Sequence, residues 1–257
     1  YFYFLLYTFV VIFKSMINDE NIILSDNEIE NAFLLASETF VYDDIIQKLK
    51  SNDDKNKAIY ILNLDELKTT EDSNLFWTHL TGFSNDIREA CAFKLDEFLN
   101  ENYKNSHTFS ILTENQNAVD ILIKSISDIN PSICRLVIGT LNKFNFQKLL
   151  QEKITKKSLE ILSNDNLNTI KKGYKINKQM FRLYWNLEAL CNLNLEFNTD
   201  LKELIIKCAH MDEFYTIREK VAKILYNNPS FDDEKILLVK RKLKSDFCFY
   251  VSRFSIN

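Results

Sequence analysis

Apolar residues recur along this 257-residue chain with the period of an α-helix. In the stretch IREACAFKL at 87–95, Ile87, Cys91 and Leu95 fall on one stripe, and polar residues lie opposite. The stretch IREKVAKIL at 217–225 repeats five of the nine letters and the same stripe. The pattern predicts two amphipathic helices that fill equivalent places in a repeated structure.

Each copy opens with the spelling of a capping box. In such a box the first side chain accepts a hydrogen bond from an amide of the first helical turn, and a glutamate reaches back to the cap. The two boxes are Asp86 with Glu89 and Thr216 with Glu219. The repetition therefore predicts the helix start as well as the buried stripe.

Asn130-Pro131 predicts the start of another such helix, because asparagine caps helices and proline suits the first turn. A weaker copy of the same amphipathic helix is centred on Leu183. Between equivalent aliphatic residues, among them Ile133, the spacings are 46, 50 and 34 residues, which is typical of helix pairs. Further periodic segments predict helices at 27–38, 41–50, 54–64, 73–83, 116–128, 146–163, 199–211, 232–244 and 247–256, with a lysine-rich insertion at 164–175.

A single helix pair cannot bury its apolar face, so copies stack into a continuous core. The chain resembles the HEAT-repeat family over residues 73–228. The resemblance rests on the turn motif Asp128-Ile-Asn-Pro131 and on the Ile-Arg openings that contain Arg88 and Arg218. It implies an all-α solenoid of about five to six stacked antiparallel helix pairs, with the arginines in a polar ladder between neighbouring units.

Two departures limit this assignment. Ile133 is followed by Cys134 where the family pattern has arginine, and the unit around Leu183 matches poorly. An armadillo-like or other helical repeat is therefore the alternative subtype. A non-repetitive helical bundle is the alternative fold.

The composition favours helices and excludes several kinds of chemistry. Only three glycines and two prolines occur, whereas sandwiches, barrels and βαβ folds need many such residues in their turns. Glycine-rich phosphate loops are excluded, and no metal-ligand or nucleophile signature occurs, so we expect no cofactor, no metal and no enzymatic activity. Five scattered cysteines suit buried positions in a reducing compartment, which predicts a cytoplasmic protein.

The first residues stand apart from the rest. Residues 1–13 are almost entirely apolar. This segment is too short for a membrane span and lacks the flanking residues of a signal peptide. We interpret residues 1–15 as an overhang upstream of a true start at Met16, with a membrane or export segment and a packed helix as alternatives. Residues 16–257 are predicted to form one solenoid domain, with no membrane contact unless residues 1–13 are native.

Charge is divided unevenly along the chain. The net charge is −4, but residues 1–130 carry −12 and residues 131–257 carry +8. A candidate basic patch in the second half comprises Lys153, Lys156, Lys157, Lys171, Lys172, Lys175, Lys178 and Arg182. The patch suggests phosphate or nucleic-acid binding, but ordinary solvated lysines are the favoured explanation of the run, and the acidic whole chain makes a nucleic-acid partner the less favoured one.

The second helix of each pair supplies the other candidate surface. Positions opposite the buried stripe predict partner-binding residues at Glu89, Phe93, Asp96, Arg135, Lys223 and Tyr226. The favoured hypothesis is a non-enzymatic scaffold that binds a protein or peptide on this concave surface. One alternative is a structural protein that assembles head to tail through its oppositely charged halves, and another is nucleic-acid binding through the basic patch.

Aromatic clusters around Trp77 and Trp185 admit two interpretations. A base-stacking pocket, as in HEAT-like DNA glycosylases, would need a catalytic carboxylate, and Glu188 lies one helical turn from Trp185. Aromatic residues at helical spacing more often fill a core. The core interpretation is the favoured one.

Overall fold

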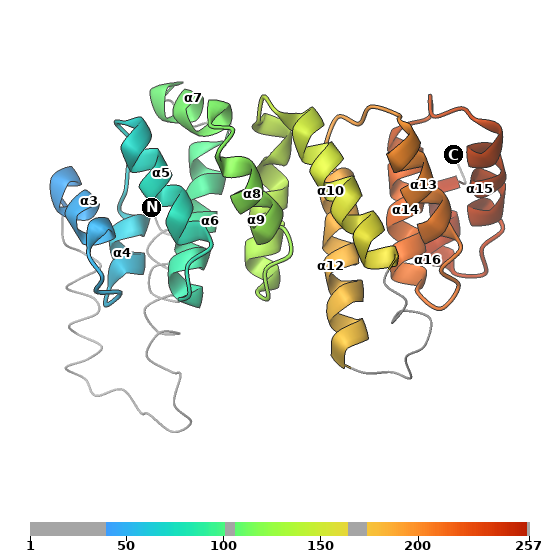
Figure 1. Cartoon of the computed structure of the whole chain (residues 1–257), viewed down its shortest axis with the longest axis horizontal. Coiled ribbons are helices and arrows are strands. Elements are labelled where there is room, and N and C mark those ends of the chain that lie inside the picture. The colour runs from blue at the N-terminus through green and yellow to red at the C-terminus, as the bar shows by residue number, and fades with distance from the viewer. Residues whose placement is uncertain (1–39, 101–105, 164–173, 256–257) are drawn as a thin grey trace. The chain divides into compact units, whose positions relative to one another are not determined.

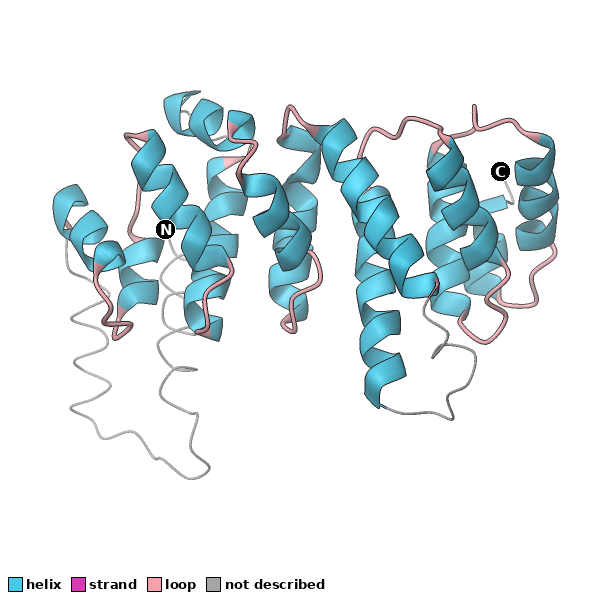
Figure 2. Cartoon of the chain, viewed as in Figure 1, coloured by secondary structure: helices cyan, strands magenta, loops and turns pink. Residues whose placement is uncertain are grey.

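The computed structural model of the chain describes residues 40–100, 106–163 and 174–255. Within these ranges the regular structure is helical and contains no strand (Figure 2). The all-α prediction is confirmed. The helix predicted at 27–38 and the apolar start lie outside the described residues.

The chain divides into two compact units between Ile121 and Leu122. Helix α8 (Ala118–Ser125) runs through this division. The first unit contains α3 (Tyr42–Lys50), α4 (Lys57–Leu62), α5 (Thr70–Leu80), α6 (Asn85–Phe98) and α7 (Ser106–Glu114). The second contains α9 (Pro131–Thr140), α10 (Gln147–Leu162), α12 (Tyr174–Leu190), α13 (Thr199–Ala209), α14 (Tyr215–Asn227), α15 (Glu234–Lys244) and α16 (Phe249–Ser252), with short 3₁₀ turns at Leu141–Lys143 and Arg253–Ser255.

Helices of the second unit form two layers (Figure 1). The first helices of the pairs, α10, α13 and α15, pack side by side in one layer. The second helices α9, α12, α14 and α16 pack in the other, and α10, α13 and α15 also contact α12, α14 and α16, respectively. Each pair thus covers the apolar side of the next, which is the stacking of an α-solenoid.

The first unit is built in the same way. Helices α3, α5 and α7 follow one another in one row, and α4 and α6 lie in the other. Helix α6 packs on both α4 and α5, as α14 packs on α12 and α13. The repeated stretch thus fills corresponding positions, and Ile87 and Ile217 are both buried there. This agrees with the prediction from the repeat.

Helix starts agree with the sequence only in part. Asn130 caps α9 by accepting a hydrogen bond from the amide of Ser132, and Pro131 is the first helical residue, as predicted. The two capping boxes are wrong, because α6 and α14 begin one residue before Asp86 and Thr216. These side chains therefore lie inside the first turn, where they cannot act as the cap.

The arginines of the repeated stretch bind the turns that precede their own helices. Arg88 Nη1 donates to the carbonyls of Gly82 and Phe83 at 3.2 and 2.9 Å. Arg218 Nη1 donates to the carbonyls seven and six residues before it, at 3.0 and 2.7 Å. In both turns the guanidinium satisfies backbone acceptors between the two helices of a pair.

Arg218 also joins successive pairs of the second unit. Its Nε and Nη2 donate to the two carboxylate oxygens of Asp246 at 2.6 and 3.1 Å, and Asp246 lies in the turn between α15 and α16. Both side chains are almost completely buried. At the corresponding place in α9, Cys134 donates its S–H to the carbonyl of Asp128 at 3.2 Å. The contact between Arg218 and Asp246 is thus one link of the predicted polar ladder, and within the described residues the cysteine forms no such link to a neighbouring pair.

Two local features were not expected from the sequence. Helix α7 falls in a segment for which the periodicity predicts no helix, and α12 begins at Tyr174, inside the predicted insertion. All five cysteines are unpaired, as expected, and three of them are buried. Burial raises the pKa of the Cys134 and Cys191 thiols to about 12, so both thiols are neutral near pH 7.

Candidate functional site

The predicted partner-binding residues of the first unit lie on α6. Glu89 is only 6% exposed, whereas Phe93 and Asp96 are half-buried. The expectation that Glu89 lies on open surface is therefore wrong. When α6 is considered alone, the side of the helix that carries Glu89 is open to solvent. In the folded chain α6 packs on α4 as well as on its own partner α5. The binding role of these three residues stays a prediction.

The predicted residues of the second unit lie on the two helices that flank α12. Arg135 is exposed on α9, and Tyr226 is exposed on α14. Lys223, also on α14, is half-buried. Helices α9 and α14 both pack on α12, so these residues border one surface, which we call the second-helix face of α9, α12 and α14.

A recess of about 520 Å³ opens on this face between α9 and α12. It contains Arg135 but neither Lys223 nor Tyr226. Three aromatic side chains, a carboxylate and an amide from α12 and the residues just after it complete much of its lining. They are Phe181, Tyr184, Trp185, Glu188 and Asn192.

Glu188 is held between two lysines of α14. Its carboxylate oxygens lie 2.8 Å from Lys220 Nζ and 3.0 Å from Lys223 Nζ. Burial would raise the pKa of Glu188, but the hydrogen bonds from Lys220 and Lys223 outweigh it and lower the pKa. Glu188 is therefore an ionised structural bridge between α12 and α14, and Lys223 has its charge engaged within the fold.

The aromatic residues pack together around Trp185 and form an aromatic wall. The Trp185 ring meets Tyr184 and Phe181 edge to face, at centroid distances of 5.2 and 6.0 Å. Two cations lie near this wall: the Arg135 guanidinium, 5.9 Å from the Trp185 ring, and Lys220 Nζ, 4.7 Å from the Tyr184 ring. Trp185 Nε1 is buried without a hydrogen-bond partner in the described part of the chain.

This arrangement suits recognition better than general acid catalysis. An acid catalyst needs a raised pKa, whereas the pKa of Glu188 is lowered and its two oxygens are occupied. The region of the recess is positively charged, because the single carboxylate of Glu188 is outnumbered by three cations, Arg135, Lys220 and Lys223. It can therefore accept an apolar or aromatic side chain that stands next to an acidic group or a carbonyl.

Sequence reasoning considered Trp185 and Glu188 as a base-stacking pocket but favoured a core role for the aromatic residues. Trp185 and its aromatic neighbours were assigned to the core, and Trp185 is indeed almost fully buried. Trp77, in the first unit, is buried as well. The signal that could have found the recess is a carboxylate one turn after an aromatic run, opposite the exposed Arg135 of the preceding second helix.

The predicted basic patch is described only in part. Lys171 and Lys172 lie outside the described residues, as does the side chain of Lys175. The other members are exposed or half-buried on the packed helices α10 and α12: Lys153, Lys156, Lys157, Lys178 and Arg182. Nothing in their described contacts places them in one cluster, so the patch stays a prediction.

The described residues lack two further features. No helix among them is long and apolar enough to cross a bilayer. No group of three or more histidine, cysteine, aspartate or glutamate side chains among them could hold a metal ion.

Two layers of helices in which each pair packs on the next define an α-solenoid, a class that includes the helical repeat proteins. No protein family matches the chain, and no curated protein sequence matches it. An engineered protein, a target of the Northeast Structural Genomics Consortium, has a similar crystal structure, with a TM-score of 0.50 and 13% identity over 84% of this chain and 96% of that one. At this identity the likeness shows the fold alone.

A designed armadillo repeat protein also matches, with a TM-score of 0.47 and 12% identity over 84% of this chain and 97% of that chain. Both neighbours are engineered or designed proteins. The packing of the helices, together with the likeness to the engineered protein at a TM-score of 0.50, establishes the all-α solenoid, whereas the HEAT subtype stays a prediction.

Proposed function

We propose that this protein is a non-enzymatic scaffold that binds a peptide segment of a partner protein on the second-helix face of α9, α12 and α14. The observation that supports the proposal is the recess between α9 and α12, where Phe181 and Trp185 form an aromatic wall and Arg135 stands exposed at the rim. Aromatic and arginine side chains are the residues that most often dominate binding energy at protein interfaces.

Ion pairs and a hydrogen bond hold side chains at and beside the recess in place. Glu188 holds Lys220 and Lys223 in place, and Asn192 Nδ2 donates to the carbonyl of Glu188 at 2.9 Å. Binding to a preformed surface loses less conformational entropy than binding to a mobile one. A partner side chain would pack on the aromatic wall while Arg135 pairs with an acidic group or a carbonyl next to it.

Peptide selection tests this proposal without a known partner. Random displayed peptides are selected on the full chain, and the Kd of each enriched peptide is then measured by tryptophan fluorescence. The Trp77→Phe variant leaves Trp185 as the one tryptophan, so the signal reports on the recess. We expect enriched peptides to change Trp185 emission and to bind at least about tenfold more weakly to Arg135→Glu.

The matched control is Lys156→Glu, which reverses one exposed cation on α10, in the layer of first helices. It should leave the Kd unchanged. Selection that yields no binder, or binders that ignore Arg135→Glu, would contradict the proposal. Turnover of a bound peptide would contradict the non-enzymatic part.

Head-to-tail assembly is the competing structural hypothesis, and it depends on the opposite charges of the two halves. Attraction between exposed charges is screened beyond ~10 Å at about 0.1 M salt. Sedimentation velocity at low and high salt therefore separates the two hypotheses. Salt-sensitive oligomers would favour assembly, and a monomer under both conditions would remove it.

A further inference from the structure

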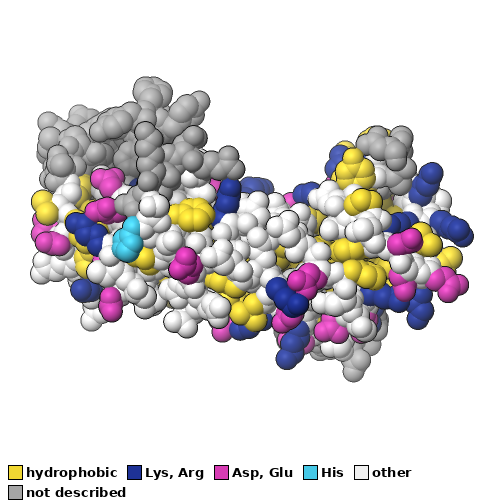
Figure 3. Space-filling model, turned by 90° about the horizontal axis from the view of Figure 1, so that it is seen from above, with side chains coloured by type: hydrophobic (Ala, Val, Ile, Leu, Met, Phe, Trp, Pro, Cys, Tyr) yellow, Lys and Arg dark blue, Asp and Glu magenta, His cyan; other side chains and the backbone are white. Residues whose placement is uncertain are grey.

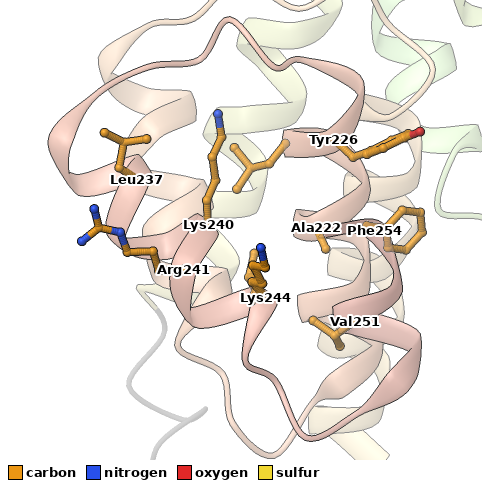
Figure 4. Close-up of a pocket in the computed structure, with 10 residues that line it drawn as sticks. Ala222, Tyr226, Leu237, Lys240, Arg241, Lys244, Val251 and Phe254 are labelled. Atoms are coloured by element: carbon orange, nitrogen blue, oxygen red, sulfur yellow. The ribbon is translucent and has the colours of Figure 1, made fainter. Parts of the chain in front are cut away.

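A second cavity lies in the second unit where α14, α15 and the segment after α15 meet (Figure 4). We call it the α15 pocket, and its volume is about 270 Å³. Figure 4 shows Leu237 of α15 on one side and Tyr226, Val251 and Phe254 on the other. Of the partner-binding residues predicted from the sequence, Tyr226 is the one that lines it.

Three cations also line the α15 pocket, and no carboxylate does. Lys240 Nζ donates to the carbonyls of Phe231 and Pro229 at 2.9 and 3.2 Å. Arg241 and Lys244 are exposed and form no ion pair with the described residues. The pocket therefore joins apolar walls to positive charge that no acidic side chain of the pocket neutralises.

Neighbouring cations of the second unit behave differently. Between residues 202 and 253, seven of the eleven lysines and arginines form ion pairs with carboxylates of the chain: Lys202, Lys207, Arg218, Lys220, Lys223, Lys242 and Arg253. Three of the remaining four line the α15 pocket, and the fourth is Lys235. Cations without an acidic partner among the described residues are thus concentrated at this cavity.

The C-terminal end of α15 explains part of this charge, because a helix dipole stabilises cations in the last turn. It does not explain the apolar opening beside them. Lys240 and Lys244 are one turn apart on the helix, and like charges at that spacing repel each other. Exposed Leu237 and Leu238 stand on the same helix, and Figure 3 shows hydrophobic side chains at the surface among Lys and Arg in the C-terminal part. An apolar group next to an anion would satisfy both features.

We infer that the α15 pocket binds an acidic segment of a partner protein, with one leucine or phenylalanine side chain inserted and flanking carboxylates paired with Arg241 and Lys244. The volume favours a single inserted side chain, because sites that enclose a whole small ligand usually measure about 300–1,000 Å³. This contact has its own chemistry and does not rest on the recess between α9 and α12.

Fluorescence polarisation with a labelled short peptide tests this inference on the full chain. The probe carries one central leucine among aspartates and glutamates, and a second probe has serine in place of the leucine. We expect binding of the leucine probe that weakens with salt, and at least about tenfold weaker binding of the serine probe. The double variant Arg241→Glu with Lys244→Glu should weaken the leucine probe by at least about tenfold, and so should Leu237→Asp.

Matched controls come from the same helix. Lys235→Glu reverses an exposed cation outside the pocket, and Leu238→Asp places the same carboxylate next to Leu237 but away from the lining. Both should bind the leucine probe like the wild type. Because every substituted position is exposed, circular dichroism should show every variant folded.

Three outcomes would overturn the inference. The first is binding that is equal in pocket and control variants, or that depends on Arg135 instead. The second is equal binding of the leucine and serine probes. The third is that the leucine probe does not bind, whereas another occupant does. That occupant would be decanoate, or a second copy of the chain detected by sedimentation, with binding that depends on Leu237 and Arg241.

Discussion

In the turn before α9, Cys134 donates its S–H to the carbonyl of Asp128 at 3.2 Å. In the turn before α14, Arg218 occupies the corresponding position and donates to the carbonyl of Asp212 at 2.7 Å. Both donors reach a carbonyl six residues before them. Both turns thus receive a hydrogen bond from the side chain at this position, although the donor differs.

The two donors differ in what else they reach. A thiol offers one weak hydrogen bond, but a guanidinium offers five N–H groups in a fixed fork. Arg218 uses the rest of its fork to hold Asp246, which lies in the turn of the following pair. The cysteine turn is a local cap, whereas the arginine turn also couples neighbouring pairs of the solenoid.

Among substitutions in these two turns, removal of Arg218 should lower the free energy of unfolding the most. Arg218→Ala leaves Asp246 as a buried carboxylate without its partner, which should lower the free energy of unfolding by about 3 kcal/mol. Urea unfolding followed by circular dichroism measures it. The control Lys242→Ala removes an exposed pair with Asp212 and should cost less than about 1 kcal/mol. Equal losses in the two variants would show that the buried ion pair stabilises the fold no more than the exposed one.

The pH dependence of stability should carry the signature of the same pair. The hydrogen bond from Arg218 holds the pKa of Asp246 below its ordinary value of about 3.9. The pair therefore contributes fully above pH ~4, and its contribution is lost as the pH falls through the lower pKa of the folded state. Asp246→Asn keeps the hydrogen bond to the amide of Cys248 but removes the charge. Its unfolding free energy should be lower at neutral pH and fall less steeply in acid, and parallel curves would contradict the coupling.

Cys134→Ala should have the smallest effect of the three. It removes one neutral hydrogen bond and a small buried side chain, so a loss of about 1 kcal/mol in unfolding free energy is expected. The same urea titration measures it beside Arg218→Ala. A loss as large as that of Arg218→Ala would mean that the bond to the turn carbonyl, and not the ion pair, dominates both turns.

The sequence predicted the repeat better than it predicted the helix starts. The stripe through Ile87 and Ile217 fixes which face is buried, because an apolar face must be covered wherever the helix packs. The caps were harder, since Asp86 and Thr216 match a capping box whether they stand at the cap or inside the first turn. Helix α7 was missed because its segment carries no clear apolar period.

The candidate site was predicted less completely than the fold. Arg135 and Tyr226 are exposed near cavities, as the projection opposite the buried stripe suggested. Glu89 is buried because neighbouring helices cover a flank that one helix alone leaves open. The sequence offered Trp185 and Glu188 only as a base-stacking pocket, which the core interpretation displaced, and the packing of α9 on α12 is what places them in a recess beside Arg135.

The sequence by itself determined that this chain forms amphipathic helices, that they come in pairs and that the pairs repeat, because helical period and turn chemistry are local properties. The tertiary structure decided which carboxylate meets Arg218, which lysines hold Glu188 and which cations remain at the α15 pocket. Those contacts join residues about thirty positions apart. Their partners depend on how whole helices pack, which no local pattern records.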